Sequence, residues 1–226
     1  MSAPRMSEPR VVSTGRDQVG ESPAWDPATQ ALYWVDIESR QVHRLDRASA
    51  QQQTWNLPER VGCIALTAAH CDGLITPNGL AFSPDDSILY FSDSHPSVQK
   101  VWAFDFDLAQ GRLGAGREFL DMTQMPGRPD GAAVDVDVEG CHWICGNDAG
   151  LVHRFSPAGA LLSSHPVPVA KPSMCAFGGP QLDTLLVTSI CPAGVAGGLC
   201  GAVFAFDAGV RGRAEPRFSR FPSVGA

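Results

Sequence analysis

Residues 77–93 read PNGLAFSPDDSILYFSD, and this stretch decides the fold. Pro77 and Gly79 hold a polar side chain, that of Asn78, at the entrance of a short apolar strand. A Ser-Pro-Asp-Asp turn follows, and residues 88–91 form a second strand. The stretch therefore predicts a β-hairpin with an amide side chain at its mouth.

The same pattern recurs along the chain. The matching pieces are ESPAWDP at 21–27 with ALYWVD at 31–36, PDGAAVD at 129–135 with CHWIC at 141–145, and CAFGGP at 175–180 with LLVTS at 185–189. Aligned on their first strands, the copies stand roughly 45 to 57 residues apart, which is the spacing of a propeller blade. The sequence therefore predicts an all-β fold, a β-propeller.

Length and composition agree with this fold. The chain has 226 residues, of which 44% are hydrophobic, and its 23 Gly and 18 Pro suit short strands joined by frequent turns. We expect residues 1–10 to be a disordered tail and residues 11–226 to form a single propeller domain.

Charge limits the partners. The net charge is −7 and the 17 Lys and Arg are scattered, whereas binding to phosphates needs a basic face. No run of about 18 apolar residues exists, and residues 1–12 carry Arg and Pro where a signal peptide needs an apolar core. We expect a cytoplasmic protein with no nucleic-acid partner and no membrane partner.

The cysteines predict buried free thiols rather than a metal site. Their number is odd and no Cys-x-x-Cys pair occurs. Cys141 and Cys145 are expected on one face of a strand, with Trp143 between them. The seven positions are Cys63, Cys71, Cys141, Cys145, Cys175, Cys191 and Cys200.

Strands can be assigned across the repeats. Residues 11–14 are expected to close the ring by joining the last blade, with residues 218–221 as their neighbour, and residues 191–199 are expected to form a surface loop. The other expected strands include 22–25, 32–36, 41–46, 53–57, 98–107, 117–120, 151–156 and 201–207.

One repeat is interrupted. Residues 61–66 begin a blade, but residues 67–74 carry no strand pattern and Ile75 at once opens the next repeat. The rest of a four-stranded unit cannot fit into about eight residues, because strands average five or six residues each. Most of one blade, the second, is therefore predicted to be missing.

Three oxygen-bearing side chains occupy matching places in the repeats. A propeller brings the entrances of its innermost strands together around one channel, so Glu21, Asn78 and Asp130 should converge. Alone, Asn78 or Asp130 would be read as a turn residue; their matching positions favour a shared site. Two carboxylates and an amide oxygen suit Ca²⁺, Mg²⁺ or Mn²⁺.

These motifs resemble the senescence-marker protein, regucalcin and gluconolactonase family of six-bladed β-propellers. The resemblance runs from Gly20 onward and is carried by GESPAWD at 20–26, LYWVDI at 32–37, PNGLAFSPD at 77–85, RPDG at 128–131 and AFGGP at 176–180 with VTS at 187–189. It implies that Glu21, Asn78 and Asp130 bind a divalent metal ion in the central channel, and that the substrate is a sugar lactone.

The chain departs from the family in one place. The Arg-x-Asn-Asp-Gly motif of the family's second blade, which adds an Asn near the metal and substrate contacts, has no counterpart, and the gap falls at residues 67–74. A gene-model error, a natural deletion and an artificially shortened chain would all leave this sequence.

The resemblance implies metal-assisted hydrolysis of the lactone ester. The metal ion polarises the carbonyl and lowers the pKa of a bound water, and Asp130 is the candidate general base because the resemblance places it beside both metal and substrate. The ion could be Ca²⁺, Mg²⁺, Mn²⁺ or Zn²⁺, although oxygen ligands disfavour a structural zinc. The alternative is a propeller that binds a divalent metal without catalysis.

Other polar residues are assigned structural roles. Residues 135–140 resemble the start of an EF-hand loop, but its position 12 is Gly146 and no helices flank it, so we reject a calcium site there. Strand-end residues are expected to cap turns, and His43 and His153, each followed by Arg, are expected to be structural. The strand-end residues are Asp36, Asp93, Ser94, Thr188 and Ser189.

Overall fold

The computed structural model describes residues 7–26, 29–56, 75–108, 112–136, 140–195 and 198–214. Within these ranges the chain forms sixteen β-strands, β1–β16, and no helix. The strands make four antiparallel sheets of four strands each. The prediction of an all-β propeller built from repeated hairpins is thereby confirmed.

The first sheet contains strands close to their predicted positions. Along β3, Leu32 and Trp34 are buried, while Tyr33 and Val35 between them are partly exposed, as expected when successive side chains point to opposite faces. The sheet runs outward in the order β2 (Gly20–Asp26), β3 (Ala31–Asp36), β4 (Gln41–Asp46) and β5 (Gln52–Asn56).

The second sheet is the hairpin that opens the repeat pattern, extended by two strands. Val101 and Ala103 on β8 are fully buried, and Trp102 and Phe104 on the other face are partly exposed, which confirms the predicted alternation. The order is β6 (Pro77–Phe82), β7 (Ile88–Asp93), β8 (Lys100–Asp107) and β9 (Arg112–Asp121).

The third sheet holds the most deeply buried strand. Every residue of β11 is buried, and Trp143, Ile144 and Cys145 have no exposed surface, because this strand is covered on both faces by neighbouring blades. The order is β10 (Arg128–Val134), β11 (His142–Asn147), β12 (Leu151–Phe155) and β13 (Leu161–Pro166).

The fourth sheet joins the two ends of the described chain. Its order is β14 (Pro172–Gly178), β15 (Thr184–Ser189), β16 (Phe204–Asp207) and β1 (Arg10–Val11). The predicted closure by the first strand is confirmed, but its partner is β16. The expected partner, residues 218–221, lies outside the described residues.

The predicted N-terminal tail also needs correction. The main chain of Asp207 donates to the hydroxyl of Ser7 at 2.6 Å, and Arg10 already pairs with Ala205. Residues 7–10 are therefore bound to the last blade, and only residues 1–6 of the predicted tail lie outside the described residues.

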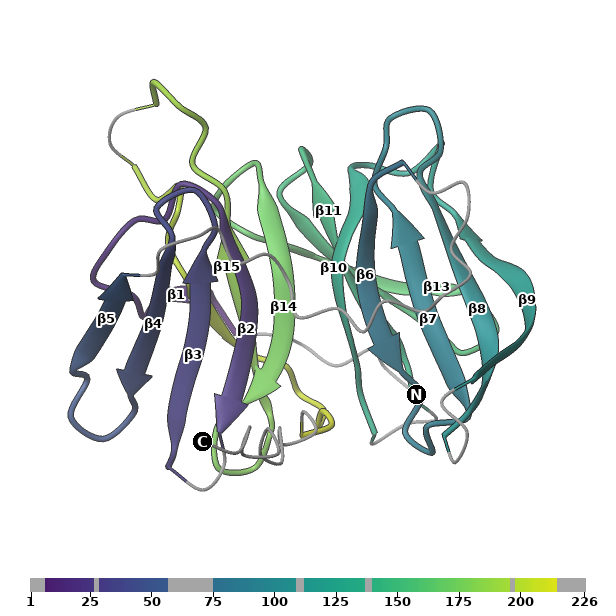
Figure 1. The fold of residues 1–226 in the computed structure, drawn as a ribbon, viewed down its shortest axis with the longest axis horizontal. Coiled ribbons are helices and arrows are strands. Elements are labelled where there is room, and N and C mark those ends of the chain that lie inside the picture. The colour runs from purple at the N-terminus through teal and green to yellow at the C-terminus, as the bar shows by residue number, and fades with distance from the viewer. Residues whose placement is uncertain are drawn as a thin grey trace, which may run out of the picture.

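The inner strands stand in the spatial order β2, β14, β10 and β6, each in contact with the next (Figure 1). Glycine permits this close approach. A Cβ atom on Gly79 would lie 2.6 Å from the carbonyl oxygen of Asp130, and one on Gly131 would lie 2.7 Å from that of Ser173. The four strands therefore bring residues from distant repeats to one axis.

The two ends of this series do not pack as the inner neighbours do. Among the described residues, β2 and β6 lack the extensive contact that joins β2 to β14, β14 to β10 and β10 to β6. Residues 57–74, which include the predicted strand at 61–66 and the interruption at 67–74, lie outside the described residues. The described sheets thus form an arc of four blades.

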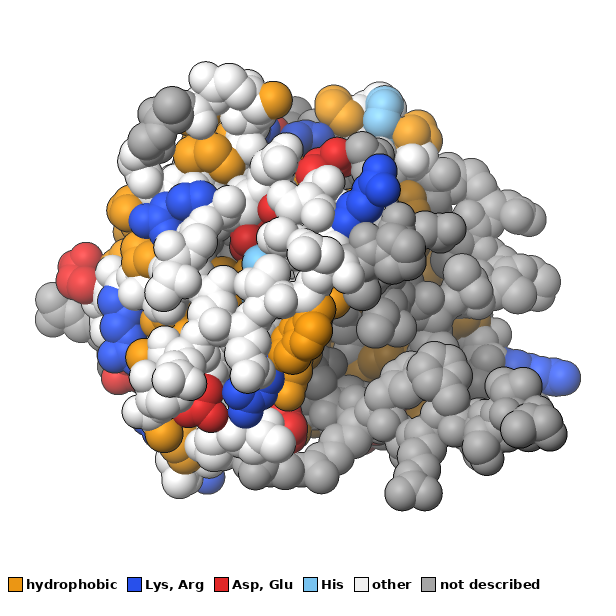
Figure 2. All heavy atoms as spheres, turned by 60° about the vertical axis from the view of Figure 1, so that its left-hand side comes forward, with side chains coloured by type: hydrophobic (Ala, Val, Ile, Leu, Met, Phe, Trp, Pro, Cys, Tyr) orange, Lys and Arg blue, Asp and Glu red, His pale blue; other side chains and the backbone are white. Residues whose placement is uncertain are grey.

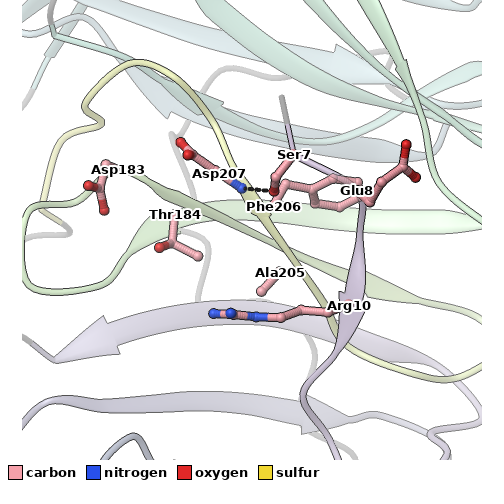
Figure 3. Close-up of a pocket in the computed structure, with 8 residues that line it drawn as sticks. All are labelled: Ser7, Glu8, Arg10, Asp183, Thr184, Ala205, Phe206 and Asp207. Carbon is pink, nitrogen blue, oxygen red and sulfur yellow. Dashed lines mark hydrogen bonds between the residues drawn. The ribbon is translucent and has the colours of Figure 1, made fainter. Parts of the chain in front are cut away.

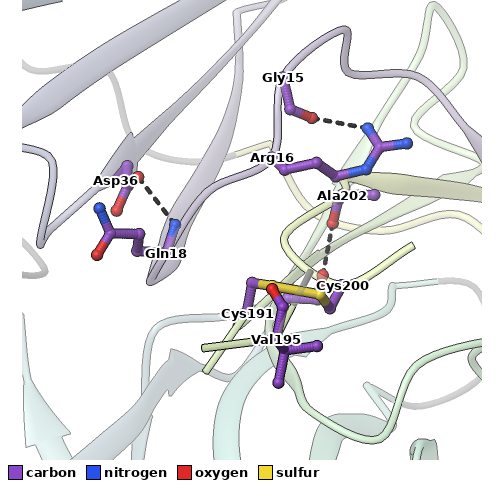
Figure 4. Close-up of a disulfide and its surroundings, with 9 residues drawn as sticks. Gly15, Arg16, Gln18, Asp36, Cys191, Val195, Cys200 and Ala202 are labelled. Atoms are coloured by element: carbon purple, nitrogen blue, oxygen red, sulfur yellow. Dashed lines mark hydrogen bonds between the residues drawn. A yellow bond between two sulfur atoms is a disulfide. The ribbon is translucent and has the colours of Figure 1, made fainter. Parts of the chain in front are cut away.

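The surface loop after β15 corrects the cysteine prediction. Cys191 and Cys200 form a disulfide across this loop, and the main chain of Cys191 donates to the carbonyl of Gln18 at 3.0 Å (Figure 4). Cys141, Cys145 and Cys175 are buried free thiols, as predicted, while Cys63 and Cys71 lie outside the described residues. Periodicity could not reveal this pair, because a turn in the loop brings the two cysteines together.

The surface is consistent with the predicted absence of a basic face on the side seen in Figure 2. There, Lys and Arg side chains are scattered among Asp and Glu rather than gathered into one patch. Among the described residues, none belongs to a helix long and apolar enough to cross a membrane.

Candidate functional site

Each inner strand is irregular at the same place. The pairing register shifts between Glu21 and Ala24, between Asn78 and Ala81, between Pro129 and Ala132, and between Pro172 and Cys175. A bulge redirects nearby side chains and is common beside functional sites. Glu21 and Asn78 directly precede their bulges, and Asp130 lies within its own.

Two aspartates fix the entrances of the strands that carry the site. Asp36 accepts hydrogen bonds from the main-chain N–H groups of Gln18 and Val19, at 2.9 and 3.0 Å. Asp93 accepts the equivalent bonds from Ile75 and Thr76, at 2.8 and 3.0 Å. Their predicted role as caps is confirmed, and each cap ends two residues before Glu21 or Asn78.

The strand-end hydroxyls act differently. Ser94 donates to the carbonyl oxygen of Pro129 at 2.5 Å, and Ser189 donates to that of Ala202 at 2.8 Å. Thr188 donates to the carbonyl oxygen of Met174 at 3.4 Å. These groups therefore link strands and blades instead of capping turns, because the neighbouring strand is closer than the next turn.

Asp130 is buried and held by two amides. The side-chain amide of Asn78 donates to its Oδ1, and the amide of Asn147 donates to its Oδ2 at 2.5 Å. Burial raises the pKa of Asp130 to about 7, although both amides and the positive charge of Arg128 lower it. The residue is only 5% exposed.

Glu21 lies within electrostatic range of Asp130. Burial is the largest cause that raises the pKa of its carboxyl well above the ordinary value, and the charge of Asp130 raises that pKa further. The three residues predicted to converge, Glu21, Asn78 and Asp130, are thus brought together by β2, β6 and β10. Their roles as metal ligands stay a prediction.

Asn147 was missed by sequence reasoning. It ends β11 and is 3% exposed, and its Oδ1 is buried with no hydrogen-bond partner among the described residues. Leaving a buried acceptor unpaired costs about 1–3 kcal/mol. The repeats contain a signal for this residue. Asp36 and Asp93 stand at equivalent strand ends, and in the third repeat the strand pairing puts Gly146 at that position, so that the polar residue, Asn147, comes one position later.

The donor set fits a hard cation. Two carboxyl groups meet amide side chains here, and the oxygen of Asn147 has no donor to satisfy it. In the parts of the chain that are described, no group of three or more His, Cys, Asp and Glu side chains is arranged to hold a metal ion. A cation at this site would therefore be bound through a mixed set of carboxylate and amide oxygens.

The rejected EF-hand resemblance has a structural explanation. Asp135 is fully buried and accepts hydrogen bonds from the main chain of Cys141 at 2.9 Å and from the indole of Trp143 at 3.0 Å. Arg154 donates to the same carboxylate at 2.9 and 2.7 Å. An arginine already neutralises this carboxylate, and residues 137–139 lie outside the described residues.

The two histidines at equivalent strand positions are structural, as predicted. His43 is hydrogen-bonded to the hydroxyl of Thr54 at 2.9 Å, and His153 to that of Ser164 at 2.8 Å. In both sheets the partner lies directly opposite on the outermost strand. The same pairing of a histidine with a hydroxyl group occurs in both sheets because the two blades have the same strand arrangement.

A pocket of about 380 Å³ lies on the last blade, apart from these residues (Figure 3). Its wall combines the N-terminal segment with β15 and β16, and it contains none of the residues predicted for the site. The lining residues are Ser7, Glu8, Arg10, Asp183, Thr184, Ala205, Phe206 and Asp207.

Comparison with known proteins gives one family and its relatives. The family described as SMP-30/Gluconolactonase/LRE-like region matches residues 19–75 and 65–191. The 6-deoxy-6-sulfogluconolactonase of Pseudomonas putida is 31% identical over 280 positions, which cover 89% of this chain and 95% of that protein. The pentonolactonase XacC of Haloferax volcanii is 27% identical over 290 positions, covering 94% and 98%.

The same alignments show how many aligned positions of these relatives have no counterpart in this chain. In the first, 89% of 226 residues is about 201, so about 79 of the 280 positions have no residue of this chain. In the second, 94% is about 212, which leaves about 78 of 290. The two family matches meet at residues 65–75, between β5 and β6. The chain is thus shortened, by more than a single repeat of roughly 45 to 57 residues.

A solved structure supports the fold. The calcium-binding protein regucalcin of Agrobacterium tumefaciens str. C58 superimposes with a TM-score of 0.80 at 23% identity, over 94% of this chain and 98% of that one. At this identity the likeness concerns the fold alone.

Proposed function

Because the chain belongs to the SMP-30/gluconolactonase/LRE-like family, we propose that it is an enzyme that hydrolyses the ring ester of sugar lactones. One observation carries the proposal: Glu21 and the buried Asp130, two carboxyl groups from different blades, lie within electrostatic range of each other at the axis. Two relatives named as lactonases support the substrate class.

The activity we propose depends on a divalent metal ion. Glu21, Asn78 and Asp130 would hold it through oxygen atoms, with Ca²⁺, Mg²⁺, Mn²⁺ and Zn²⁺ as the candidates. When bound, such an ion supplies Lewis acidity toward a carbonyl group and makes water more acidic. The raised pKa values of both carboxyls support this, because burial disfavours their charged forms and the charge of Asp130 raises the pKa of Glu21 further, so a cation beside them would stabilise the ionised pair.

Asp130 is the proposed general base. Its two amide donors fix the carboxylate, so that one oxygen can accept a proton from the water that attacks the lactone carbonyl. The C–O bond of the ring ester then breaks, and the ring oxygen takes up the proton held by Asp130 and leaves as a hydroxyl group. Without a bound ion, burial raises the pKa of Asp130 to about 7, and a cation beside the carboxylate would lower that pKa and favour the ionised form that can accept a proton.

A lactone panel tests the proposal. The full chain is freed of metal with a chelator, then assayed with aldono-1,4- and aldono-1,5-lactones while each of the four ions is added back. Acid release is followed with a pH indicator. We expect turnover that is lost on chelation, restored by at least one ion, and lowered by about 10²- to 10⁴-fold in Asp130→Asn.

The matched control is Asp105→Asn. Asp105 lies on β8 with an exposed side chain that forms a surface ion pair with Arg117 at 3.5 Å. Its substitution should leave turnover unchanged. Equal turnover by Asp130→Asn and the wild type would refute Asp130 as base, and hydrolysis that persists without metal would refute the metal dependence.

A second function is supported by the interrupted ring. In the described part of the chain, β2 and β6, which carry Glu21 and Asn78, lack the packing that joins the other inner strands. A propeller that binds a divalent metal without catalysis would keep Glu21, Asn78 and Asp130. Calorimetric metal binding without turnover of any lactone would favour this alternative.

A further inference from the structure

Asn147 is placed against Asp130 by the pairing of β10 with β11. In this register Arg128 lies opposite Asn147, so Asn147 stands just beside the bulge that contains Asp130. Its amide Nδ2 donates to Oδ2 of Asp130 at 2.5 Å. Asn78 donates to the other oxygen from β6. The carboxylate is therefore held from both sides by different strands.

The strand end that carries Asn147 is anchored. The next residue, Asp148, has a left-handed backbone, with φ at 76°. Its carboxylate accepts from Arg128 at 2.7 Å and forms an ion pair with Lys171. These contacts tie the end of β11 to β10 and to the start of the fourth blade. The side chain before Asp148 thus has little freedom to move.

The other half of Asn147 has no structural use. Its Oδ1 is buried and accepts no hydrogen bond from any described residue. An asparagine kept for packing would have both halves of its amide paired, as most buried polar groups do. The side chain instead donates to Asp130 and leaves its acceptor unsatisfied, so its hydrogen bond is with the site and not with the core.

We propose that Asn147 is a positioning residue, whose amide N–H fixes the carboxylate of Asp130 in the orientation that binds the cation and accepts the proton. Its catalytic part rests on the proposed function; its effect on metal binding does not require turnover. Residues that orient metal ligands typically change metal affinity by about 10- to 100-fold when they are substituted.

Two substitutions separate the donor from the acceptor. Asn147→Leu removes both at similar volume, whereas Asn147→Asp keeps an oxygen and removes the donor. We expect both variants to lose metal affinity by about 10- to 100-fold, measured calorimetrically with Mn²⁺ and Ca²⁺ on chelator-treated protein. For a lactone that the wild type hydrolyses, kcat should fall while KM changes little. Asn56→Leu is the matched control, because Asn56 is exposed on β5 and accepts from Gln41.

Three outcomes overturn the inference. Unchanged metal affinity in Asn147→Leu would do so, and so would affinity retained or strengthened in Asn147→Asp, which would make the oxygen a ligand. A fall in the metal-free melting temperature with no change in affinity or kcat would assign Asn147 to the core. Failure of the wild type to hydrolyse any lactone would instead refute the proposed function, and the metal titrations would still test the role of Asn147.

A measurement on the wild-type side chains covers variants that do not fold. The sequence has three asparagines, Asn56, Asn78 and Asn147, so ¹⁵N-asparagine labelling gives three side-chain amide pairs in an NMR spectrum. Asn147 should supply a pair with slow hydrogen exchange, shifted by Asp130→Asn and by Mg²⁺. A third pair that exchanges as fast as that of exposed Asn56 would contradict the hydrogen bond to Asp130.

Discussion

Asp130 and Asp135 are both buried and stand five positions apart, yet the protein treats them in opposite ways. Asp135 has no exposed surface and is neutralised by Arg154, with Trp143 and the main chain of Cys141 as further donors. Asp130 receives only neutral amide donors, from Asn78 and Asn147. The fold itself supplies the positive charge that neutralises Asp135. The charge of Asp130 is left for a cation that the chain does not supply.

The difference shows how a buried carboxylate can be assigned a role. A charge that leaves water must be paired or must give up its ionised form. Asp135 is paired, which makes it structural. The pKa of Asp130 is instead raised to about 7 by burial, and such perturbed groups concentrate at functional sites. Four predictions test this division.

The largest expected effect is on catalysis. Asp130→Asn should lower lactone turnover by about 10²- to 10⁴-fold, because the proton acceptor and one cation ligand are both lost. The folded protein should remain as stable as the wild type or become more stable, since a buried charge is removed. Turnover assays and thermal unfolding of the same sample measure both. A variant that is inactive only because it is unfolded would break the comparison.

The second effect is on stability. Asp135→Asn leaves the guanidinium of Arg154 buried without its counter-charge, so unfolding should become easier by about 3–5 kcal/mol, measured by urea denaturation. The exposed Asp105→Asn should change stability by no more than about 1 kcal/mol. Equal stability of Asp135→Asn and wild type would remove the structural role assigned to Asp135.

The third prediction couples the site to pH and metal. With a pKa raised to about 7, Asp130 binds its proton more tightly in the folded than in the unfolded chain, so its contribution favours folding at low pH and is lost as pH rises from about 4 to 7, by about 3–4 kcal/mol. A bound cation should reverse this loss. Added Ca²⁺ or Mn²⁺ should therefore raise the melting temperature more at pH 8 than at pH 5, and an equal rise at both would contradict it.

The smallest effect concerns a buried histidine away from the site. His142 packs against the rings of Tyr90 and Phe119, and burial lowers its pKa to about 3. The unfolded chain takes up a proton below about pH 6.5 and the folded chain does not, so stability falls as pH drops, by about 2 kcal/mol at pH 5. Replacing His142 with Phe should reduce the fall in the free energy of unfolding below about pH 6.5, measured by denaturation at a series of pH values. A slope that persists unchanged would assign it to another group.

Sequence reasoning succeeded where the signal was repetitive. The hairpin at 77–93, the strands around it and the caps at Asp36 and Asp93 could be predicted because alternation and turn residues are local properties of the chain. Glu21, Asn78 and Asp130 were found through their shared place in the repeats. The size of the interruption could not be predicted, because the sequence shows where the repeat pattern breaks and not how many residues are missing.

Other features had no repetitive signal. Asn147 occurs once and its repeat counterparts are not amides, and the disulfide between Cys191 and Cys200 depends on how a loop folds back. The pairing of β1 with β16 joins segments from opposite ends of the chain, and no local pattern identifies that partner.

The sequence by itself determined the blades, since each needs only an apolar alternation and turns at a fixed spacing. Only the tertiary structure decided which carboxylate is neutralised and which is not. It is the strands packed against the two aspartates that bring Arg154 to Asp135 and two amides to Asp130. The electrostatic environment of a residue depends on which groups surround it in space, and the order of residues along the chain does not record this.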